Sequence, residues 1–178
     1  MLFQSTRASS PRFEPMQAEL LGAGGTLVNA WGDVDNDGDP DLYVGFGGAA
    51  NRLYRNDAGV LVNVAAEAGL AEARATRGAA WGDFDADGDA DLLVGYAPGT
   101  ESVLALYRND KGRMTNVTAA AGLAVATGAV RQLAWIDLDA DDDLDLFVAF
   151  RDRANALFVN AAGRFSDVAE RVDRKSVV

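Results

Sequence analysis

Three clusters of aspartate dominate the chemistry that this sequence could perform. In the first two, carboxylates alternate with other residues through nine positions in the pattern Asp-x-Asp-x-Asp-Gly-Asp-x-Asp. The third cluster keeps the alternation but has Asp142 where the others have Gly38 and Gly88. The candidate metal ligands in these clusters are Asp33, Asp35, Asp37, Asp39, Asp41, Asp83, Asp85, Asp87, Asp89, Asp91, Asp137, Asp139, Asp141, Asp143 and Asp145.

Alternating carboxylates in a tight loop direct several hard oxygen ligands toward one centre. Oxygen ligands without nitrogen or sulfur donors select calcium or magnesium, and a flexible cage dominated by protein ligands favours calcium. The sequence therefore predicts Ca²⁺ in the first two loops, where glycine permits the sharp bend. The third loop predicts a weaker site, because Asp142 tolerates a positive φ less well than glycine does.

Two other interpretations of the loops are weaker. A helix-loop-helix calcium site needs a bidentate Glu at its twelfth position, and that position holds Val44, Val94 or Val148. A solvated Asp-rich turn is the plainer alternative, but five mutually repelling carboxylates repeated in three equivalent places argue against it. We expect the Asp at position 7 of each loop to ligate through its main-chain carbonyl.

The composition excludes several classes of function. The chain has 178 residues, a formal net charge of −11 and neither cysteine nor histidine. Disulfide frameworks, thiolate nucleophiles, Ser-His-Asp triads and histidine zinc sites are therefore excluded. The acidity also argues against nucleic acid or anionic lipid as a partner, and no apolar run is long enough to predict membrane insertion or a signal peptide.

Each Asp cluster belongs to a unit of about 50 residues that occurs three times. A tryptophan precedes each cluster, and a continuous apolar run follows it, which indicates a strand buried on both faces. The second unit predicts four strands, over residues 76–84, 91–96, 103–108 and 113–118, with a hairpin turn at 109–112. Repeated four-stranded sheets of this kind are typical of β-propeller blades. We therefore expect an all-β fold of three four-stranded blades with Trp31, Trp81 and Trp135 in the core between them.

The repeats also predict the domain organisation. Residues 12–172 form the β-propeller repeat region, and disordered tails are expected at residues 1–11 and 173–178. The units are expected at about residues 21–70, 71–123 and 124–172. Residues 12–20 resemble the last strand of a unit and predict an extra N-terminal strand that ends a preceding unit, so the chain is expected to be part of a larger propeller.

The motifs Trp-Gly-Asp-x-Asp-x-Asp-Gly-Asp-x-Asp-Leu, Leu-Tyr-Arg-Asn-Asp and Asn-Val-x-x-x-x-Gly-Leu resemble the FG-GAP/VCBS-type repeats. These occur in integrin α-chain propellers and in bacterial secreted proteins of the ASPIC/UnbV kind. The resemblance spans about residues 12–172 and implies a propeller of seven or so blades, with structural calcium in the loop between the first two strands of a blade. Ile136 and Asp142 depart from the pattern. Because propellers close with four to eight blades, assembly of two chains into a six-bladed ring is the alternative to a larger propeller.

The resemblance implies a calcium-binding module for recognition of, or adhesion to, a protein or glycan outside the cell. Extracellular, periplasmic or cell-surface localisation is expected on the same ground. A calcium-dependent lectin is one alternative, with the tryptophans or Tyr43, Tyr54, Tyr96 and Tyr107 stacking on sugar rings. A non-catalytic segment of a larger secreted enzyme is another. Catalysis within the chain is not expected, because no nucleophile-and-base pair or phosphate-binding glycine loop is present.

Overall fold

The computed structural model describes residues 17–22 and 24–170, and nearly all of its regular structure is β-strand. The elements in chain order are α1 (Ala18–Leu21), β1 (Thr26–Gly32), β2 (Asp41–Phe46), β3 (Arg52–Asp57), β4 (Val60–Asn63), β5 (Thr76–Gly82), β6 (Asp91–Tyr96), β7 (Leu104–Asp110), β8 (Arg113–Asn116), β9 (Val130–Ile136), β10 (Asp145–Phe150), β11 (Ala156–Ala161) and β12 (Arg164–Asp167).

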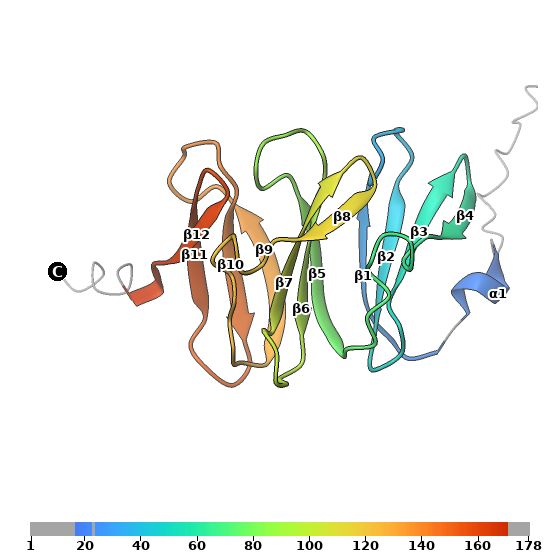
Figure 1. Ribbon diagram of the computed structural model, residues 1–178. Helices are drawn as coiled ribbons and strands as arrows, with labels where there is room; N and C mark the ends of the chain where they lie inside the picture. Colours follow the sequence, from blue (N-terminus) through green and yellow to red (C-terminus); the bar gives the residue numbers. More distant parts are fainter. Residues whose placement is uncertain (1–16, 23, 171–178) are drawn as a thin grey trace, which may run out of the picture.

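The twelve strands form three separate four-stranded sheets, each with its strands in sequence order and every neighbouring pair antiparallel. We call the sheets β1–β4, β5–β8 and β9–β12 blades 1, 2 and 3. Figure 1 shows them standing face to face in a row, and the first strands β1, β5 and β9 contact one another in turn. The predicted all-β, propeller-like fold of three four-stranded blades is confirmed, with strand boundaries in blade 2 within a few residues of those expected.

The second strand of each blade carries most of the core. All six residues of β2 and of β6 are buried, as their continuous apolar runs predict. The apolar side chains pack into clusters between adjacent blades. Blade 2 packs one face against blade 1 and the other face against blade 3. The second strand of blade 3 differs: Phe147 is partly exposed, because no further sheet covers this side of blade 3 among the described residues.

Tryptophan and glycine make the contact between adjacent first strands. The Trp81 indole lies against Gly32 of blade 1 and donates its Nε1–H to the carbonyl of Ala30 at 3.1 Å. The Trp135 indole lies against Gly82 of blade 2, but its Nε1–H has no hydrogen-bond partner among the described residues. The prediction that the tryptophans lie between blades holds for these two. It is wrong for Trp31, which is 56% exposed, because no described sheet lies on that side of β1.

The predicted N-terminal strand falls partly outside the described residues, which begin at 17. The prediction is wrong for residues 17–20, which the structure describes: Ala18–Leu21 is a single helical turn, closed by the N–H of Gly22, which donates to the carbonyl of Ala18 at 2.8 Å. The Gln17 side chain accepts from the N–H of Leu61 at 2.8 Å and donates to its carbonyl at 3.1 Å, which ties this segment to β4. In blade 3 the N–H of Phe165, the residue equivalent to Leu61, donates to Ala121 in the turn that follows β8 of blade 2.

The predicted tails at residues 1–11 and 173–178 also lie outside the described residues. Within the described part of the chain, α1 has four residues and no helix is long and apolar enough to cross a membrane.

Candidate metal centres

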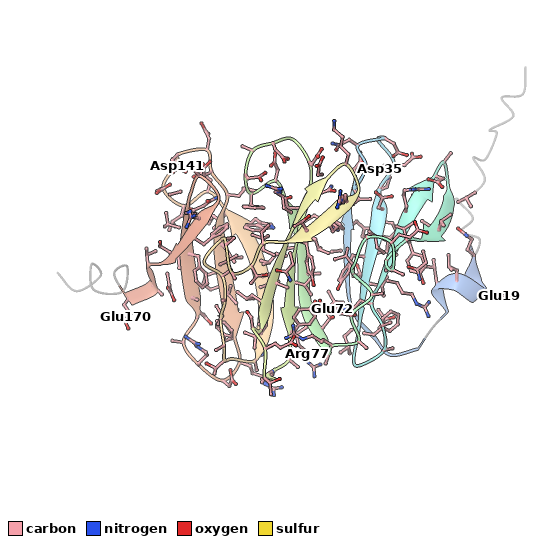
Figure 2. All side chains as sticks on the ribbon, viewed as in Figure 1. Glu19, Asp35, Glu72, Arg77, Asp141 and Glu170 are labelled. Atoms are coloured by element: carbon pink, nitrogen blue, oxygen red, sulfur yellow. The ribbon has the colours of Figure 1, made fainter. Side chains whose placement is uncertain are left out.

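The three Asp loops join the first strand to the second in every blade, and therefore lie at one edge of the row of sheets. Figure 2 shows Asp35 and Asp141 at this edge, away from Glu72 and Arg77. We number the nine positions of each loop from Asp33, Asp83 and Asp137. The local reason for this placement is the hairpin itself, since the flanking strands pair in register up to the ends of the loop, as in Gly32 with Asp41.

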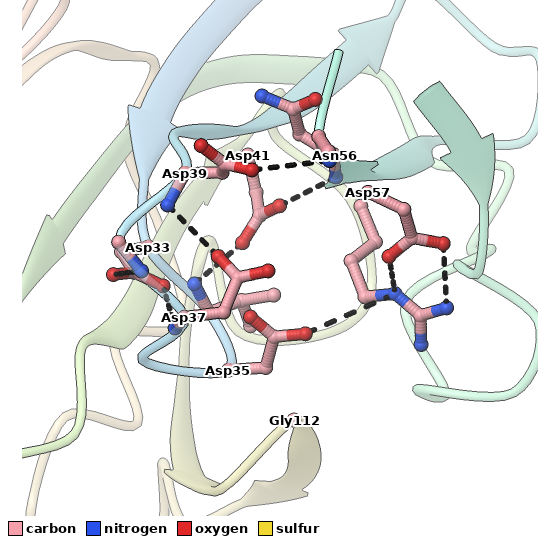
Figure 3. Close-up of polar contacts among 12 residues, drawn as sticks. Asp33, Asp35, Asp37, Asp39, Asp41, Asn56, Asp57 and Gly112 are labelled. Carbon is pink, nitrogen blue, oxygen red and sulfur yellow. Dashed lines mark hydrogen bonds and ion pairs between the residues drawn. The ribbon is translucent and has the colours of Figure 1, made fainter. Parts of the chain in front are cut away.

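The Asp at position 9 anchors each loop to its blade. Asp41 is fully buried and accepts the N–H of Val34 at 2.6 Å and the N–H of Asn56 at 2.7 Å (Figure 3). Asp91 accepts the equivalent N–H groups of Phe84 and Asn109 at 3.0 and 2.8 Å. Asp145 makes the same pair of bonds in blade 3. One carboxylate therefore holds the start of the loop and the end of the third strand together.

The Asp at position 1 orders the middle of the first two loops. Asp33 accepts the N–H groups of Asp37 at 3.2 Å and Gly38 at 2.9 Å, and Asp83 makes the equivalent bonds at 3.1 and 3.0 Å. In loop 3, Asp137 instead accepts the N–H of Ala140 at 2.8 Å. The bend needs a left-handed residue at position 6 in every loop, where φ is 92° at Gly38, 93° at Gly88 and 71° at Asp142. The structure thus places Asp142 in the conformation that its sequence position predicts.

Three carboxylates converge in every loop, with one oxygen of each lying within 4.8 Å of the others. The converging sets are Asp33, Asp35 and Asp37 in loop 1, Asp83, Asp85 and Asp91 in loop 2, and Asp137, Asp139 and Asp145 in loop 3. Positions 1 and 3 contribute in all three loops, and the third member differs. Among the candidate ligands, Asp39, Asp41, Asp87, Asp89, Asp141 and Asp143 stand outside these sets.

A cation fits the first two clusters because one oxygen in each lacks a protein partner. Asp35 Oδ1 and Asp85 Oδ1 are buried and make no hydrogen bond to any described residue. A buried carboxylate oxygen without a partner is costly, and a hard cation accepts such oxygens as ligands. The nearest described cation to Asp35 is Arg55, whose Nε lies 3.8 Å from Asp35 Oδ2. The same Nε lies closer to Asp57 Oδ1, at 2.8 Å, so Arg55 neutralises Asp35 only weakly.

The Asp at position 7 bonds to the hairpin between the third and fourth strands. Asp39 accepts the N–H of Ala58 at 3.0 Å, Asp89 that of Lys111 at 3.0 Å, and Asp143 that of Ala162 at 3.3 Å. These side chains are thereby directed away from the converging oxygens. Ligation through the main-chain carbonyl at this position stays a prediction.

Burial opposes the ionised form of several of these carboxyl groups. Burial raises the pKa of Asp91 to about 7, although the N–H groups of Asn109 and Phe84 act in the opposite direction. Burial also raises the pKa of Asp41 and, with added repulsion from Asp87 and Asp83, the pKa of Asp85. A bound cation would remove this penalty, because it favours the charged form of every ligand.

Sequence reasoning missed one set of site residues, the asparagines at the end of each third strand. Asn109 Nδ2 donates to the carbonyl of Val34 at 2.8 Å, and Asn160 Nδ2 donates to the carbonyl of Phe84 at 2.8 Å. Each side chain therefore reaches position 2 of the Asp loop in the preceding blade. The recurrence of asparagine at this place in all three units was the available signal, but its partner lies about 75 residues away.

Loops 1 and 2 are also bridged directly. Asn36 Nδ2 donates to Asp89 Oδ1 at 2.6 Å and approaches the carbonyl of Gly88 at 3.4 Å. The equivalent of Asn36 is Ala86 in loop 2 and Ala140 in loop 3, so this bridge has no counterpart between loops 2 and 3. The first two candidate sites are therefore physically linked.

The comparison with known families agrees with the repeats seen in the sheets. The family model described as FG-GAP-like repeat matches residues 33–94. The matched stretch begins at Asp33, includes the first two Asp loops in full and ends within β6. No curated protein matches the chain. Residues 33–94, with their two Asp loops and the strands that position them, are therefore similar to the FG-GAP-like repeat.

Proposed function

We propose that this chain is a calcium-binding β-propeller repeat module that recognises a protein or glycan outside the cell, with calcium in a structural role. The observation that carries the calcium part is the convergence of three carboxylates in each Asp loop, with a buried, unpartnered oxygen on Asp35 and on Asp85. An all-oxygen donor set in a loop built mainly of protein ligands is the chemistry that calcium prefers over magnesium.

The ion would act by holding each loop closed against its own charge. Without a cation, the three converging carboxylates of each loop repel one another over short distances. Asp33, Asp35 and Asp37 would hold the ion in loop 1, with Asp41 keeping the loop on its blade. Because the loops lie beside the blade interfaces, closing them also steadies the contact between neighbouring blades.

Thermal unfolding with calcium and with EDTA tests this role. At free calcium about 100 times the dissociation constant, each occupied site adds about 2.7 kcal/mol of stability, so the melting temperature should rise by several degrees. Magnesium at the same concentration is the matched control and should give a smaller shift. The calcium role fails if the melting temperature and the ion content measured by native mass spectrometry are the same after EDTA treatment.

The ligand-recognition part rests on the resemblance of the repeats to FG-GAP-type propeller modules, and we assign it to loops other than the Asp loops. Sugar stacking on the tyrosines has no support, since Tyr43, Tyr54, Tyr96 and Tyr107 are all buried in the core. Screening the calcium-loaded protein on arrays of glycans and of extracellular proteins tests this part. An asparagine variant of Asp35 and Asp85 is the control, because it weakens the ion sites and keeps the rest of the surface.

A further inference from the structure

A basic hollow lies between blades 2 and 3, at the edge opposite the Asp loops. Its volume is about 540 Å³, and its charged lining residues are Arg77, Arg131, Arg151 and Asp152. Arg77 and Arg131 are the second residues of β5 and β9, and Arg151 follows the last residue of β10. Figure 2 shows Arg77 at this edge, away from Asp35 of loop 1. Three cations and one anion therefore line a single hollow.

Two other arginines near this edge are held by the fold. Arg74 Nη2 donates to the carbonyl of Ser102 at 2.7 Å, and Arg74 Nη1 lies 3.2 Å from Glu101 Oε2. Arg153 Nη1 donates to the carbonyl of Thr127 at 3.0 Å. Both guanidinium groups therefore have partners within the blades, and structural contacts account for their positions.

The arginines that line the basic hollow have no such partners. Arg77, Arg131 and Arg151 are exposed, and their guanidinium groups make no hydrogen bond, ion pair or ring contact with the described residues. The acid beside them, Asp152, uses its Oδ1 to accept the N–H of Ala129 at 2.7 Å. Because positive charges gathered in one place repel one another, an anion that enters the hollow is attracted without displacing a described protein partner.

The basic hollow is particular to one blade interface. Arg77 and Arg131 occupy the same place in the repeat, because each follows the first residue of the first strand of its blade. In blade 1 this place is held by Leu27. The interface of blades 2 and 3 therefore has a guanidinium from both first strands, whereas the interface of blades 1 and 2 has one from blade 2 alone.

The negative charge of the Asp loops is too distant to cancel the basic hollow. Arg131 lies six positions before Asp137 along β9, which corresponds to about 20 Å of strand. Charges are screened over about 8 Å at physiological salt. Glu72, which Figure 2 shows at the same edge as Arg77, already accepts the hydroxyl of Tyr107 at 2.9 Å. The overall charge of −11 is therefore compatible with a positive potential in the hollow.

We propose that the basic hollow binds an acidic sugar, with Arg77, Arg131 and Arg151 on its carboxylate and Asp152 on a neighbouring hydroxyl group. Guanidinium groups bind carboxylates through paired N–H donors, and the hollow has the size of small-ligand pockets, about 300–1,000 Å³. The hydroxyl acceptor beside the cations distinguishes a sugar acid from a carboxylate alone. The proposal rests on the ligand-recognition part of the proposed function, to which it gives a site and a ligand class, and it does not depend on the calcium part.

NMR titration of the calcium-loaded protein with glucuronate, glucose and acetate provides the test. We expect glucuronate to bind at least tenfold more tightly than glucose and to shift the signals of residues at the hollow. The Arg131→Ala/Arg151→Ala variant should bind glucuronate at least tenfold more weakly. Asp152→Ala should lower the ratio of glucuronate affinity to acetate affinity, because it removes the hydroxyl acceptor.

The matched control removes the same charge from the other edge. Arg113 and Arg164 are exposed and begin β8 and β12, beside the hairpins that the Asp loops contact. Arg113→Ala/Arg164→Ala should therefore bind glucuronate as the wild type does. Equal weakening in both double variants would show a general effect of net charge and would overturn the assigned site.

Two further results would overturn the proposal. One is wild-type binding of acetate as tight as that of glucuronate, which would mark a simple anion site. The other is no binding of glucuronate. If the wild type still binds glycans or proteins on arrays in that case, the hollow is wrong and the proposed function stands, whereas failure of both overturns the two together.

Discussion

Loops 2 and 3 have nearly the same pattern of aspartates, yet they stand in different surroundings. Loop 2 lies under the hairpin of blade 3, where the Phe84 ring packs 6.0 Å from the Phe165 ring and the Phe84 carbonyl accepts from Asn160. Position 2 of loop 3 is Leu138, which is 42% exposed, whereas Phe84 is 4% exposed. The difference teaches that an Asp loop is covered by the blade that follows it.

We expect the largest loss of stability from removing the Asp91 carboxylate, which anchors loop 2 to its blade. Asp91→Ala leaves the buried N–H groups of Phe84 and Asn109 without acceptors, at about 1–3 kcal/mol each. Asp145→Ala should cost less, because the N–H of Leu138 is only partly buried and water replaces the lost acceptor. Urea unfolding in calcium measures both, and equal losses would remove the distinction between the loops.

The pH dependence of stability should reverse sign with calcium. In EDTA, the pKa of Asp91 is raised to about 7 in the folded state from 3.8. The folded protein therefore binds the proton that the unfolded chain loses between about pH 4 and 7, and stability falls as the pH rises through that window.

With calcium, the ligands must be ionised, so the stabilisation by the ion should grow as the pH rises. Thermal unfolding between pH 4.5 and 8 in the two conditions measures both slopes, and Asp91→Asn should flatten the EDTA slope. A wild-type slope of the same sign in calcium and in EDTA would contradict the burial of this carboxyl group as its cause.

Asn160, whose side chain bonds across a blade interface, should contribute more to the free energy of unfolding than Asn56, whose side chain bonds within its own blade. Asn160→Ala leaves the carbonyl of Phe84 without its donor. Among the described residues, the Asn56 side chain bonds only within its own blade, to Pro40 and Gly59. We expect Asn160→Ala to cost about 1–3 kcal/mol more than Asn56→Ala. Chemical unfolding compares them, and similar losses would show that the cross-blade bond contributes little.

The smallest expected effect concerns the bend of loop 3. Asp142 has φ 71°, where a side chain costs about 1 kcal/mol and glycine costs none. Asp142→Gly should therefore stabilise the protein by about 1 kcal/mol and tighten calcium binding at loop 3 in titration calorimetry. The reverse change Gly88→Asp should weaken loop 2, and a neutral result for both would show that the backbone angle is not what distinguishes the sites.

The sequence predicted the blades well because their determinants are local. Each Asp loop is a nine-residue turn whose carboxylates bond to main-chain groups two to seven positions away and, within the same blade, to groups 15–22 positions away. Each second strand is a continuous apolar run. Because both patterns repeat, the length of the unit and the order of its strands could be predicted from the sequence. The left-handed residue at position 6 was predicted on the same local grounds and is present in all three loops.

The contacts between blades were decided only by the tertiary structure. Three features depend on which sheet lies alongside: the role of Asn109 and Asn160, the bridge from Asn36 to Asp89, and the exposure of Trp31. The hydrogen bonds that cross between blades join residues 51–76 positions apart in the sequence. A repeat pattern specifies every unit equally, whereas burial depends on neighbours, and among the described residues the two end blades have a neighbouring sheet on one side only. The sequence by itself therefore determined the loops and the strands, and the stacking of the sheets decided which loops are covered and which tryptophan is exposed.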